Sequence, residues 1–224
     1  MFSVLFEVQP KPNRWDAYLE YAKLLKPELE AIDGFLDNIR YRSLTREGWL
    51  LSLSNWRDEK SLVRWRTQAK HHAVQAKGRS EVFLDYHLRV GQVTRDTRLP
   101  QGHVLNGERL DVTEVGAGST VALLDAKRAF PPHAANAVAV AAGLGLPPNA
   151  AGLVSWDVFE AVLTAGDVIL LMSWRDEAAA AAFEAGAILG EDVRLRRIRV
   201  LRDYGMFDRR EAPQYYAPLA PKTA

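Results

Sequence analysis

The chain repeats one short stretch, and the spacing of its two copies constrains the fold more than any other feature of the sequence. Residues 55–59 read NWRDE and residues 173–177 read SWRDE, which places the second copy 118 positions after the first. Two glycines and the opening segment of the chain keep the same offset: Gly34 with Gly152, Gly48 with Gly166, and residues 2–8 with residues 120–126. A register held over this distance indicates a duplicated domain, and two copies are too few for a solenoid array.

The duplication predicts how the chain is divided. A length of 224 residues fits two domains of about 100 residues each. We predict a first domain over residues 1–96, a polar linker over 97–118, a second and degenerate copy over 119–204, and a C-terminal tail over 205–224. The tail contains aromatic residues such as Tyr216, so we expect it to pack on the body of the protein.

The balance of charges and the absence of cysteine exclude several classes of function. Lys and Arg number 29 against 28 for Asp and Glu, so the net charge of +1 predicts no binding to nucleic acid or to an anionic membrane. Without cysteine there are no disulfides, thiolate metal sites or cysteine nucleophiles. The sequence has no stretch near the roughly 18 apolar residues of a membrane span and no basic leader. We therefore expect a cytoplasmic protein.

Periodicity predicts the order β-α-β-β-α-β in each copy. In the first copy the elements are expected over residues 2–8, 13–31, 36–45, 49–55, 59–77 and 82–94. In the second copy the first helix is Ala-rich and weaker, and the second helix is shorter. Each copy would form a four-stranded antiparallel sheet with both helices on one face, which leaves the other face apolar and in need of a partner.

These expectations define the fold class. We predict an α+β protein in which two tandem ferredoxin-like βαββαβ domains pack their antiparallel sheets together as a pseudo-twofold dimeric α+β barrel. The two domains would pair within one chain, and a homodimer of such chains is a further hypothesis.

The first copy also contains a series of aromatic and polar residues in a distinctive order. They are Ser54-Asn55-Trp56-Arg57-Asp58-Glu59, Trp65-Arg66, His72, Gln75, Gly78-Arg79 and Tyr86-x-Leu88-Arg89-Val90. This series resembles the antibiotic biosynthesis monooxygenase (ABM) superfamily, well over residues 1–96 and more loosely over 119–204. The resemblance implies a dimeric α+β barrel of ferredoxin-like halves. For activity it implies cofactor-independent oxidation of anthrone- or quinol-like aromatics, haem degradation, or a role that is not known.

His72 is the first candidate for chemistry. If residues 59–77 form one helix, five residues share the face toward the sheet: Leu62, Trp65, Ala69, His72 and Ala76. A histidine on that face can be a general base, a haem ligand or a core residue bonded to a carbonyl group. His71 would point about 100° away and is expected to be exposed.

Further candidates lie near this position. Arg79 could hold an anionic ligand such as a phenolate or a propionate, or act only on the helix dipole. Strand alternation decides which of Asn38, Tyr41 and Tyr86 face a cavity. The predicted catalytic residues are His72, Trp65 and Asn38, and the predicted substrate-binding residues are Arg79, Gln75, Tyr41 and Tyr86. The spacing of seven between Trp65 and His72 departs from the ten expected of the haem-degrading pattern, which would put Gln75 at the histidine position.

The other repeated residues have structural explanations. Trp56 and Trp174 are identical, but the second copy has no counterpart of His72, so we expect both tryptophans to plug the barrel ends. Three residues have predicted roles at helix ends: Asp58 and Asp176 as N-caps, and Gly78 as a C-cap. We therefore expect any site to lie in the first copy.

Three functions stay open on the sequence. The first is a monooxygenase in which His72 deprotonates a small aromatic or quinol-like substrate, whose anion reacts with O2 without a cofactor. The sequence has no GxGxxG, P-loop, HExxH or GxSxG motif, which is consistent with this hypothesis. The second is a haem-binding or haem-degrading monooxygenase with His72 as axial ligand. The third is a non-catalytic module that binds a small ligand or a partner.

Overall fold

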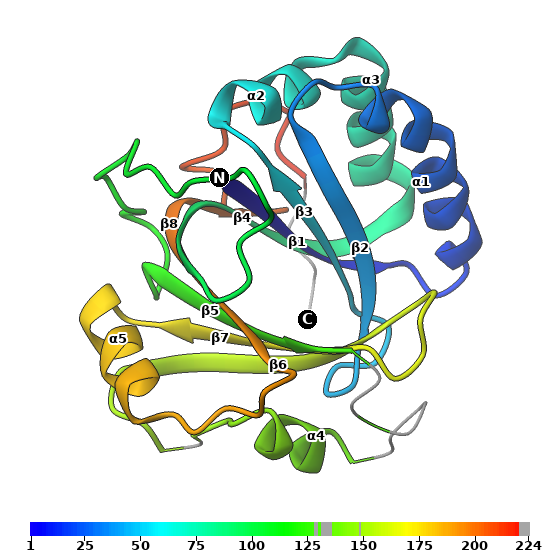
Figure 1. Cartoon of the computed structure of the whole chain (residues 1–224). Helices are drawn as coiled ribbons and strands as arrows, with labels where there is room; N and C mark the ends of the chain where they lie inside the picture. Colours follow the sequence, from blue (N-terminus) through cyan, green and yellow to red (C-terminus); the bar gives the residue numbers. More distant parts are fainter. Residues whose placement is uncertain (128–129, 131–135, 148, 220–224) are drawn as a thin grey trace.

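The structure is a computed structural model that describes residues 1–127, 130, 136–147 and 149–219 (Figure 1). The end of the predicted tail, residues 220–224, lies outside the described residues. The first half contains, in chain order, β1 (Phe2–Pro10), α1 (Trp15–Glu30), β2 (Phe35–Ser43), β3 (Leu50–Trp56), α2 (Glu59–Thr67), α3 (Ala69–Lys77), the π-helical turn η1 (Gly78–Val82) and β4 (Phe83–Asp96). The second half contains β5 (Thr120–Ala126), α4 (Ala137–Gly143), β6 (Leu153–Ala161), β7 (Val168–Trp174), α5 (Glu177–Gly186) and β8 (Arg194–Gly205).

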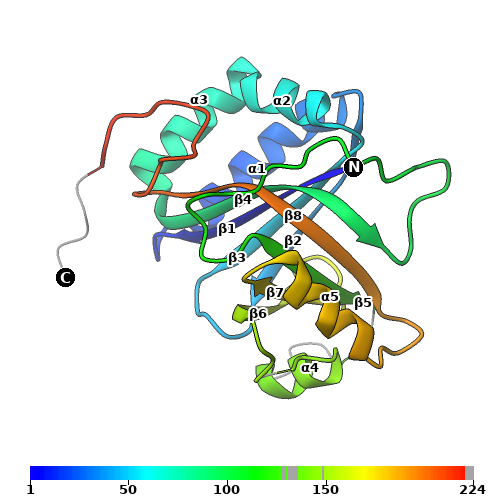
Figure 2. The same ribbon diagram turned by 90° about the vertical axis from the view of Figure 1, so that its left-hand side faces the viewer.

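The strands form one closed antiparallel barrel in the order β1-β3-β2-β6-β7-β5-β8-β4. Each half contributes four adjacent strands, and the halves join at two edges, where β2 pairs with β6 and β4 pairs with β8. Closure satisfies the backbone groups that an open sheet leaves exposed at its edges. The predicted α+β barrel of two ferredoxin-like halves is therefore confirmed (Figure 2).

Alternation along the strands separates an interior core from two outer layers. Inside the barrel, both halves contribute to one apolar cluster that includes Leu5, Leu53, Leu123 and Ile169. Outside it, α1, α2 and α3 cover the sheet of the first half, whereas α4 and α5 cover the sheet of the second half (Figures 1 and 2). Because neighbouring strand residues point to opposite faces, a shift of one position moves a side chain between the interior and a helix-covered layer. Among the described residues, no helix combines the length and apolarity that crossing a membrane requires.

The repeated aspartates at the strand-to-helix junctions have the predicted role, whereas the repeated tryptophans do not. The Asp58 carboxylate accepts a hydrogen bond from the backbone N–H of Ser61 at 2.8 Å, and Asp176 does the same for Ala179 at 2.8 Å. Both are N-caps, which satisfy backbone donors that the first helical turn leaves free. Trp56 and Trp174 are each completely buried, but they pack in the layers between helices and sheet, with Leu62 in the first half and with Ala180 in the second. The prediction that they plug the barrel ends is therefore wrong, because alternation along the strands points both side chains away from the barrel interior.

The helix expected over residues 59–77 is interrupted, which corrects the sequence prediction. Gln68 has an extended backbone conformation (φ −63°, ψ 126°), so α2 ends at Thr67 and α3 begins at Ala69. The Gln68 side chain accepts a hydrogen bond from the backbone N–H of His71 at 2.7 Å and caps the new helix. No glycine or proline marks this break, so periodicity alone extends one helix through it.

Gly78 is the C-cap of α3, as predicted. Its φ is −52°, a right-handed helical value, and the chain continues directly into η1. A Cβ atom at this position would lie 2.5 Å from the ring of Phe83. Gly78 is therefore needed for the close approach of the Phe83 ring and not for a left-handed turn.

Candidate functional site

A cavity of about 210 Å³ lies between the helices of the first half and the outer face of its sheet. Its walls are largely apolar, with side chains from α1, α2, α3, β1 and β4: Leu25, Leu29, Leu62, Val74, Phe6, Phe83 and Leu88. The segment after β8 closes one end of the cavity and contributes Arg209, Gln214 and Tyr216. Figure 2 shows this segment, in red, running beside α3.

Strand alternation decides which predicted strand residues reach this cavity. Asn38 and Arg40 on β2, and Tyr86 on β4, line it. Tyr41 lies on the opposite face of β2 and is buried in the barrel interior. The structure therefore does not bring Tyr41 to the cavity, because one position along a strand reverses the direction of the side chain.

The two adjacent histidines exchange the positions that the sequence predicted. His72 is exposed, and its ring stacks on Tyr216 with centroids 5.4 Å apart. His71 lines the cavity and stacks on Trp65, with centroids 4.1 Å apart and an angle of 16° between the rings. The prediction that His72 faces inward is wrong because the break at Gln68 ends the helical register that linked it to Trp65.

His71 is held as a neutral imidazole. Burial is the main cause that lowers its pKa from 6.5 to about 4; a hydrogen bond to the Trp65 backbone opposes this shift, and the charge of neighbouring His72 adds to it. Its Nδ1 lies 3.0 Å from the carbonyl oxygen of Trp65, which can only accept a hydrogen bond. The proton of the neutral ring is therefore assigned to Nδ1, and Nε2 is left with a free lone pair.

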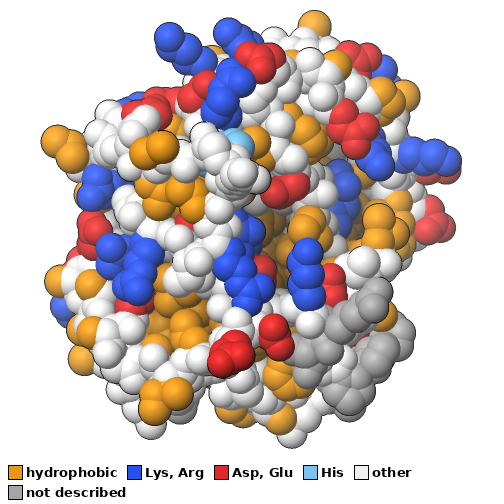
Figure 3. Space-filling model, in the orientation of Figure 1, with side chains coloured by type: hydrophobic (Ala, Val, Ile, Leu, Met, Phe, Trp, Pro, Cys, Tyr) orange, Lys and Arg blue, Asp and Glu red, His pale blue; other side chains and the backbone are white. Residues whose placement is uncertain are grey.

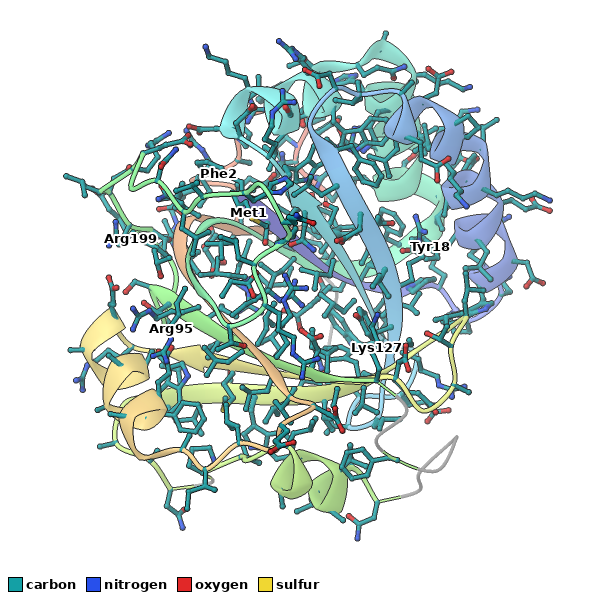
Figure 4. The ribbon with its side chains drawn as sticks, in the orientation of Figure 1. Met1, Phe2, Tyr18, Arg95, Lys127 and Arg199 are labelled. Atoms are coloured by element: carbon teal, nitrogen blue, oxygen red, sulfur yellow. The ribbon has the colours of Figure 1, made fainter. Side chains whose placement is uncertain are left out.

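Polar groups of the sheet form the floor of the cavity. Asn38 Nδ2 donates to Ser52 Oγ at 2.9 Å and to the Leu53 carbonyl at 3.2 Å. Tyr18 lies between α1 and β2 in the view of Figure 4, and it interacts with Arg40 and Ser52. Burial raises the pKa of Tyr18, so its phenol stays protonated at neutral pH. The floor therefore offers hydrogen-bond groups beneath otherwise apolar walls.

The end of the cavity near the tail brings together three predicted residues. Arg79 Nη1 donates to Tyr86 Oη at 2.6 Å and to the Met206 carbonyl at 3.1 Å. Gln75 accepts a hydrogen bond from Tyr216 Oη at 3.1 Å. The tail packs on the body, as its aromatic residues predicted, but its side chains were not predicted as site residues. The sequence feature that could have indicated them is the aromatic and basic composition of the tail. Composition alone does not predict which part of the protein the tail contacts.

Among the residues that the structure describes, four arginines and no carboxylate line the cavity. They are Arg40, Arg66, Arg79 and Arg209. On the surface in Figure 3, by contrast, Lys and Arg side chains are interspersed with Asp and Glu. Among the described residues none of the four has an ion pair, and Arg40 Nε, Arg66 Nε and Arg79 Nη2 are buried without a hydrogen-bond partner. Arg89 Nε and Arg196 Nε are buried in the same state although their side chains pair with carboxylates, so the cavity arginines are distinguished by the absence of a carboxylate partner among the described residues.

A second hollow of about 310 Å³ lies where residues 115–118 cross strands of both halves. Its polar side chains already bind one another: His87 Nε2 lies 2.6 Å from Asp203 Oδ1, and Arg89 donates to Ser173 Oγ at 2.5 Å and to Glu7. Across the part of the chain that the structure describes, no three His, Asp or Glu side chains are placed to hold a metal ion. The cavity under α1, α2 and α3 is therefore the stronger candidate for a site.

Comparison with known proteins supports the family. The family model described as antibiotic biosynthesis monooxygenase matches residues 1–77. A jasmonate monooxygenase ABM of Pyricularia oryzae is 52% identical over 225 residues, which span 98% of this chain and 100% of that protein. Among solved structures, an anthrone oxidase-like protein is 13% identical, with a TM-score of 0.33, over 95% of this chain and 96% of the other. A Pseudomonas aeruginosa protein is 13% identical, with a TM-score of 0.36, over 40% of this chain and 89% of the other. With a relative of this identity over nearly its whole length, the chain belongs to the antibiotic biosynthesis monooxygenase family.

Proposed function

We propose that this protein is a cofactor-independent monooxygenase whose substrate binds in the cavity under α1, α2 and α3. The observation that carries the proposal is His71, a neutral imidazole that lines an apolar cavity with a lone pair on Nε2. A neutral histidine in contact with a bound substrate can remove a proton from it. His71 thereby takes the role that the sequence analysis gave to His72, with Trp65 as its stacking partner.

The cavity favours a small and largely apolar substrate. Its volume of about 210 Å³ is below the range of roughly 300–1,000 Å³ typical of pockets for drug-sized ligands. The Pyricularia oryzae relative is named for jasmonate, a cyclopentanone that carries an alkenyl chain and a carboxylate. A jasmonate-like molecule is therefore the first candidate substrate, ahead of the small aromatic or quinol-like compounds expected from the sequence.

The proposed chemistry uses only side chains of this chain and O2. His71 Nε2 removes a proton from a CH2 group activated by an adjacent carbonyl, and the carbanion-like anion transfers electrons to O2. One oxygen atom enters the substrate and the other leaves as water, so CH2 and O2 become C=O and H2O with the substrate as the reductant. Because a pKa of about 4 makes His71 a weak base, the anion also needs stabilisation, for which the Arg40 guanidinium is placed, whereas both donors of the Asn38 amide are already used within the protein.

The residues do not fit haem. His72, the predicted axial ligand, is exposed outside the cavity and stacks on Tyr216. His71 has a free lone pair on Nε2, but the cavity that it lines, about 210 Å³, is small even for a drug-sized ligand and has no room for a haem. No step of the proposed reaction therefore uses haem, and a haemin titration without a specific Soret shift is the expected result.

The test is O2 consumption by His71→Gln and by the matched control His72→Gln. With jasmonate as substrate, we expect His71→Gln to lower kcat at least 100-fold, the usual contribution of a general base being roughly 100- to 10,000-fold. His72→Gln should stay within about threefold of the wild type, since His72 is outside the cavity. Circular dichroism establishes that both variants fold. Equal activity of His71→Gln and wild type, or loss of activity only in His72→Gln, would contradict the proposal.

A further inference from the structure

The four arginines of the cavity point to the charge of its ligand. Arg40, Arg66, Arg79 and Arg209 line the same apolar space, and no Asp or Glu among the described residues lines it with them. Elsewhere in the protein, buried arginines are paired: Arg89 contacts Glu7, and Arg196 lies 2.7 Å from Asp125. Of the four, Arg79 is buried and the other three are half-buried, and a shielded cation without a protein counter-ion is stabilised by an anion from outside.

We propose that the end of the cavity near the tail is a carboxylate-binding subsite, formed by Arg79 and Tyr86 of the first half and by Arg209 of the segment after β8. The proposal deepens the function proposed above, because it names the group by which the substrate is recognised. It concerns binding alone, so it can be tested without turnover.

Arg79 provides an unused donor. Only 5% of the surface of Arg79 is exposed to solvent. Nη1 is occupied by Tyr86 Oη and the Met206 carbonyl, whereas Nη2 is buried and has no hydrogen-bond partner in the described part of the chain. A guanidinium presents its donors in a planar fork that matches the two oxygens of a carboxylate. A ligand carboxylate would therefore satisfy the group that the protein leaves unpaired.

Tyr86 provides a second donor by elimination. A phenolic oxygen has two lone pairs and one hydrogen. Arg79 Nη1 and Arg209 Nη1 both donate to Tyr86 Oη, each at 2.6 Å, and so occupy both lone pairs. The phenolic hydrogen must then be donated to a further acceptor, and Tyr86 lines the cavity where a ligand oxygen would lie.

The tail holds Arg209 in this arrangement. Arg209 Nη2 donates to the Gln214 carbonyl at 2.8 Å, and Gln214 Nε2 donates to the Arg66 carbonyl at 3.0 Å. The ring of Tyr216 lies 5.2 Å from the guanidinium carbon of Arg79 and 5.2 Å from that of Arg209. These contacts couple the second half's C-terminal extension to the helices of the first half, so the subsite is incomplete without the tail.

The surroundings select a carboxylate that has an apolar body. The side chains next to Tyr86, namely Phe6 and Phe83, form edge and tilted aromatic contacts with one another and with the Tyr86 ring. A fully hydrated polyanion would lose its water here without gaining polar partners from these walls. An organic acid such as jasmonate places its charge against the arginines and its hydrocarbon against the aromatic rings.

The experiment compares the binding of jasmonate and of its uncharged methyl ester by calorimetry. We expect wild-type protein to bind the acid at least 10-fold more tightly than the ester. Arg209→Gln and Tyr86→Phe should each weaken binding of the acid by roughly 10- to 100-fold and binding of the ester by less than about threefold. Arg210→Gln is the matched control: Arg210 is adjacent, exposed and paired with Asp208, so both affinities should stay unchanged.

The outcomes separate this proposal from the oxygenase proposal. Equal affinity of wild-type protein for acid and ester, no binding of either probe, or an equal loss for both probes in Arg209→Gln would overturn the subsite. A preference for the acid that depends on Arg209 but is not accompanied by O2 uptake would leave the subsite in place and refute the oxygenase.

Discussion

The two halves are built on one pattern, but they use the space between helices and sheet differently. In the first half, α1 has 16 residues, and α2 is followed by α3 and η1. In the second half, α4 has 7 residues, and the chain runs from α5 to β8 through residues 187–193 without a further helix. The space beneath α5 is filled, because Trp174 stacks on Phe183 at 5.2 Å and Ala180 is fully buried.

This difference shows where the candidate site comes from. The motif that both halves share, Trp-Arg-Asp-Glu, caps helices and fills the core in both. The helix α3, which has no counterpart between α5 and β8, provides His71 and Gln75, and Arg79 follows it in η1. The site therefore depends on what the first half has in addition to the repeat, together with the tail contributed by the second half.

The arginines show the same contrast. On β8, Arg194 lies 2.6 Å from Asp96 and Arg199 lies 2.9 Å from Glu177, so these charges are neutralised within the protein. The arginines of the cavity lack such partners among the described residues. A structural arginine is recognised by its carboxylate partner, and a candidate binding arginine by the lack of one.

The largest expected effect tests whether the repeated tryptophans are equivalent. Trp56→Ala and Trp174→Ala should each lower the free energy of unfolding by about 3–5 kcal/mol, as for other large buried side chains. Both are fully buried and lie outside the cavity. Urea unfolding followed by circular dichroism measures the change. If Trp174→Ala left the free energy of unfolding unchanged, the tryptophan of the second half would not stabilise the fold as that of the first half does.

Replacing one alanine by phenylalanine in each half tests which half has free space between its helices and its sheet. Ala22 lines the cavity, so Ala22→Phe should fill it, weaken jasmonate binding at least 100-fold and leave the free energy of unfolding within about 0.5 kcal/mol. Ala180 is fully buried in the packed layer of the second half, so Ala180→Phe should cost about 1–3 kcal/mol of stability and leave binding unchanged. Calorimetry and urea unfolding give both quantities. If the two variants show the same changes in binding and in stability, the proposed difference between an open first half and a filled second half is wrong.

The smallest expected effect is the pH dependence due to His71. Its pKa is about 4 in the folded protein against 6.5 in an exposed histidine. As the pH falls through 6.5 the unfolded chain binds the proton first, so His71 is expected to lower stability by on the order of 2 kcal/mol between pH 7 and pH 4, with no change above pH 7. Urea unfolding at several pH values should show a flatter profile in this range for His71→Gln than for His72→Gln. Superimposable profiles would exclude burial of the His71 ring.

Much of the fold could be predicted because it depends on local pattern. Alternating apolar residues marked the strands, and Asp58 and Asp176 marked helix starts through the hydrogen bonds that short acidic side chains make with backbone N–H groups. The candidate site was predicted less completely. Trp65, Gln75, Arg79, Tyr86 and Asn38 line the cavity, whereas His72 and Tyr41 do not. Both misplaced residues are one position from a lining residue, His71 and Arg40 respectively.

The sequence by itself determined the duplication, the order of elements and the closed barrel, because periodicity, caps and short links act between residues that are close in the chain. Only the tertiary structure decided which histidine meets Trp65 and which arginines share a cavity. The break at Gln68 depends on how α2 and α3 pack, and the contacts of Arg209 and Tyr216 join residues more than a hundred positions apart. A local pattern contains no information on such contacts, since their free energy arises when distant segments pack together.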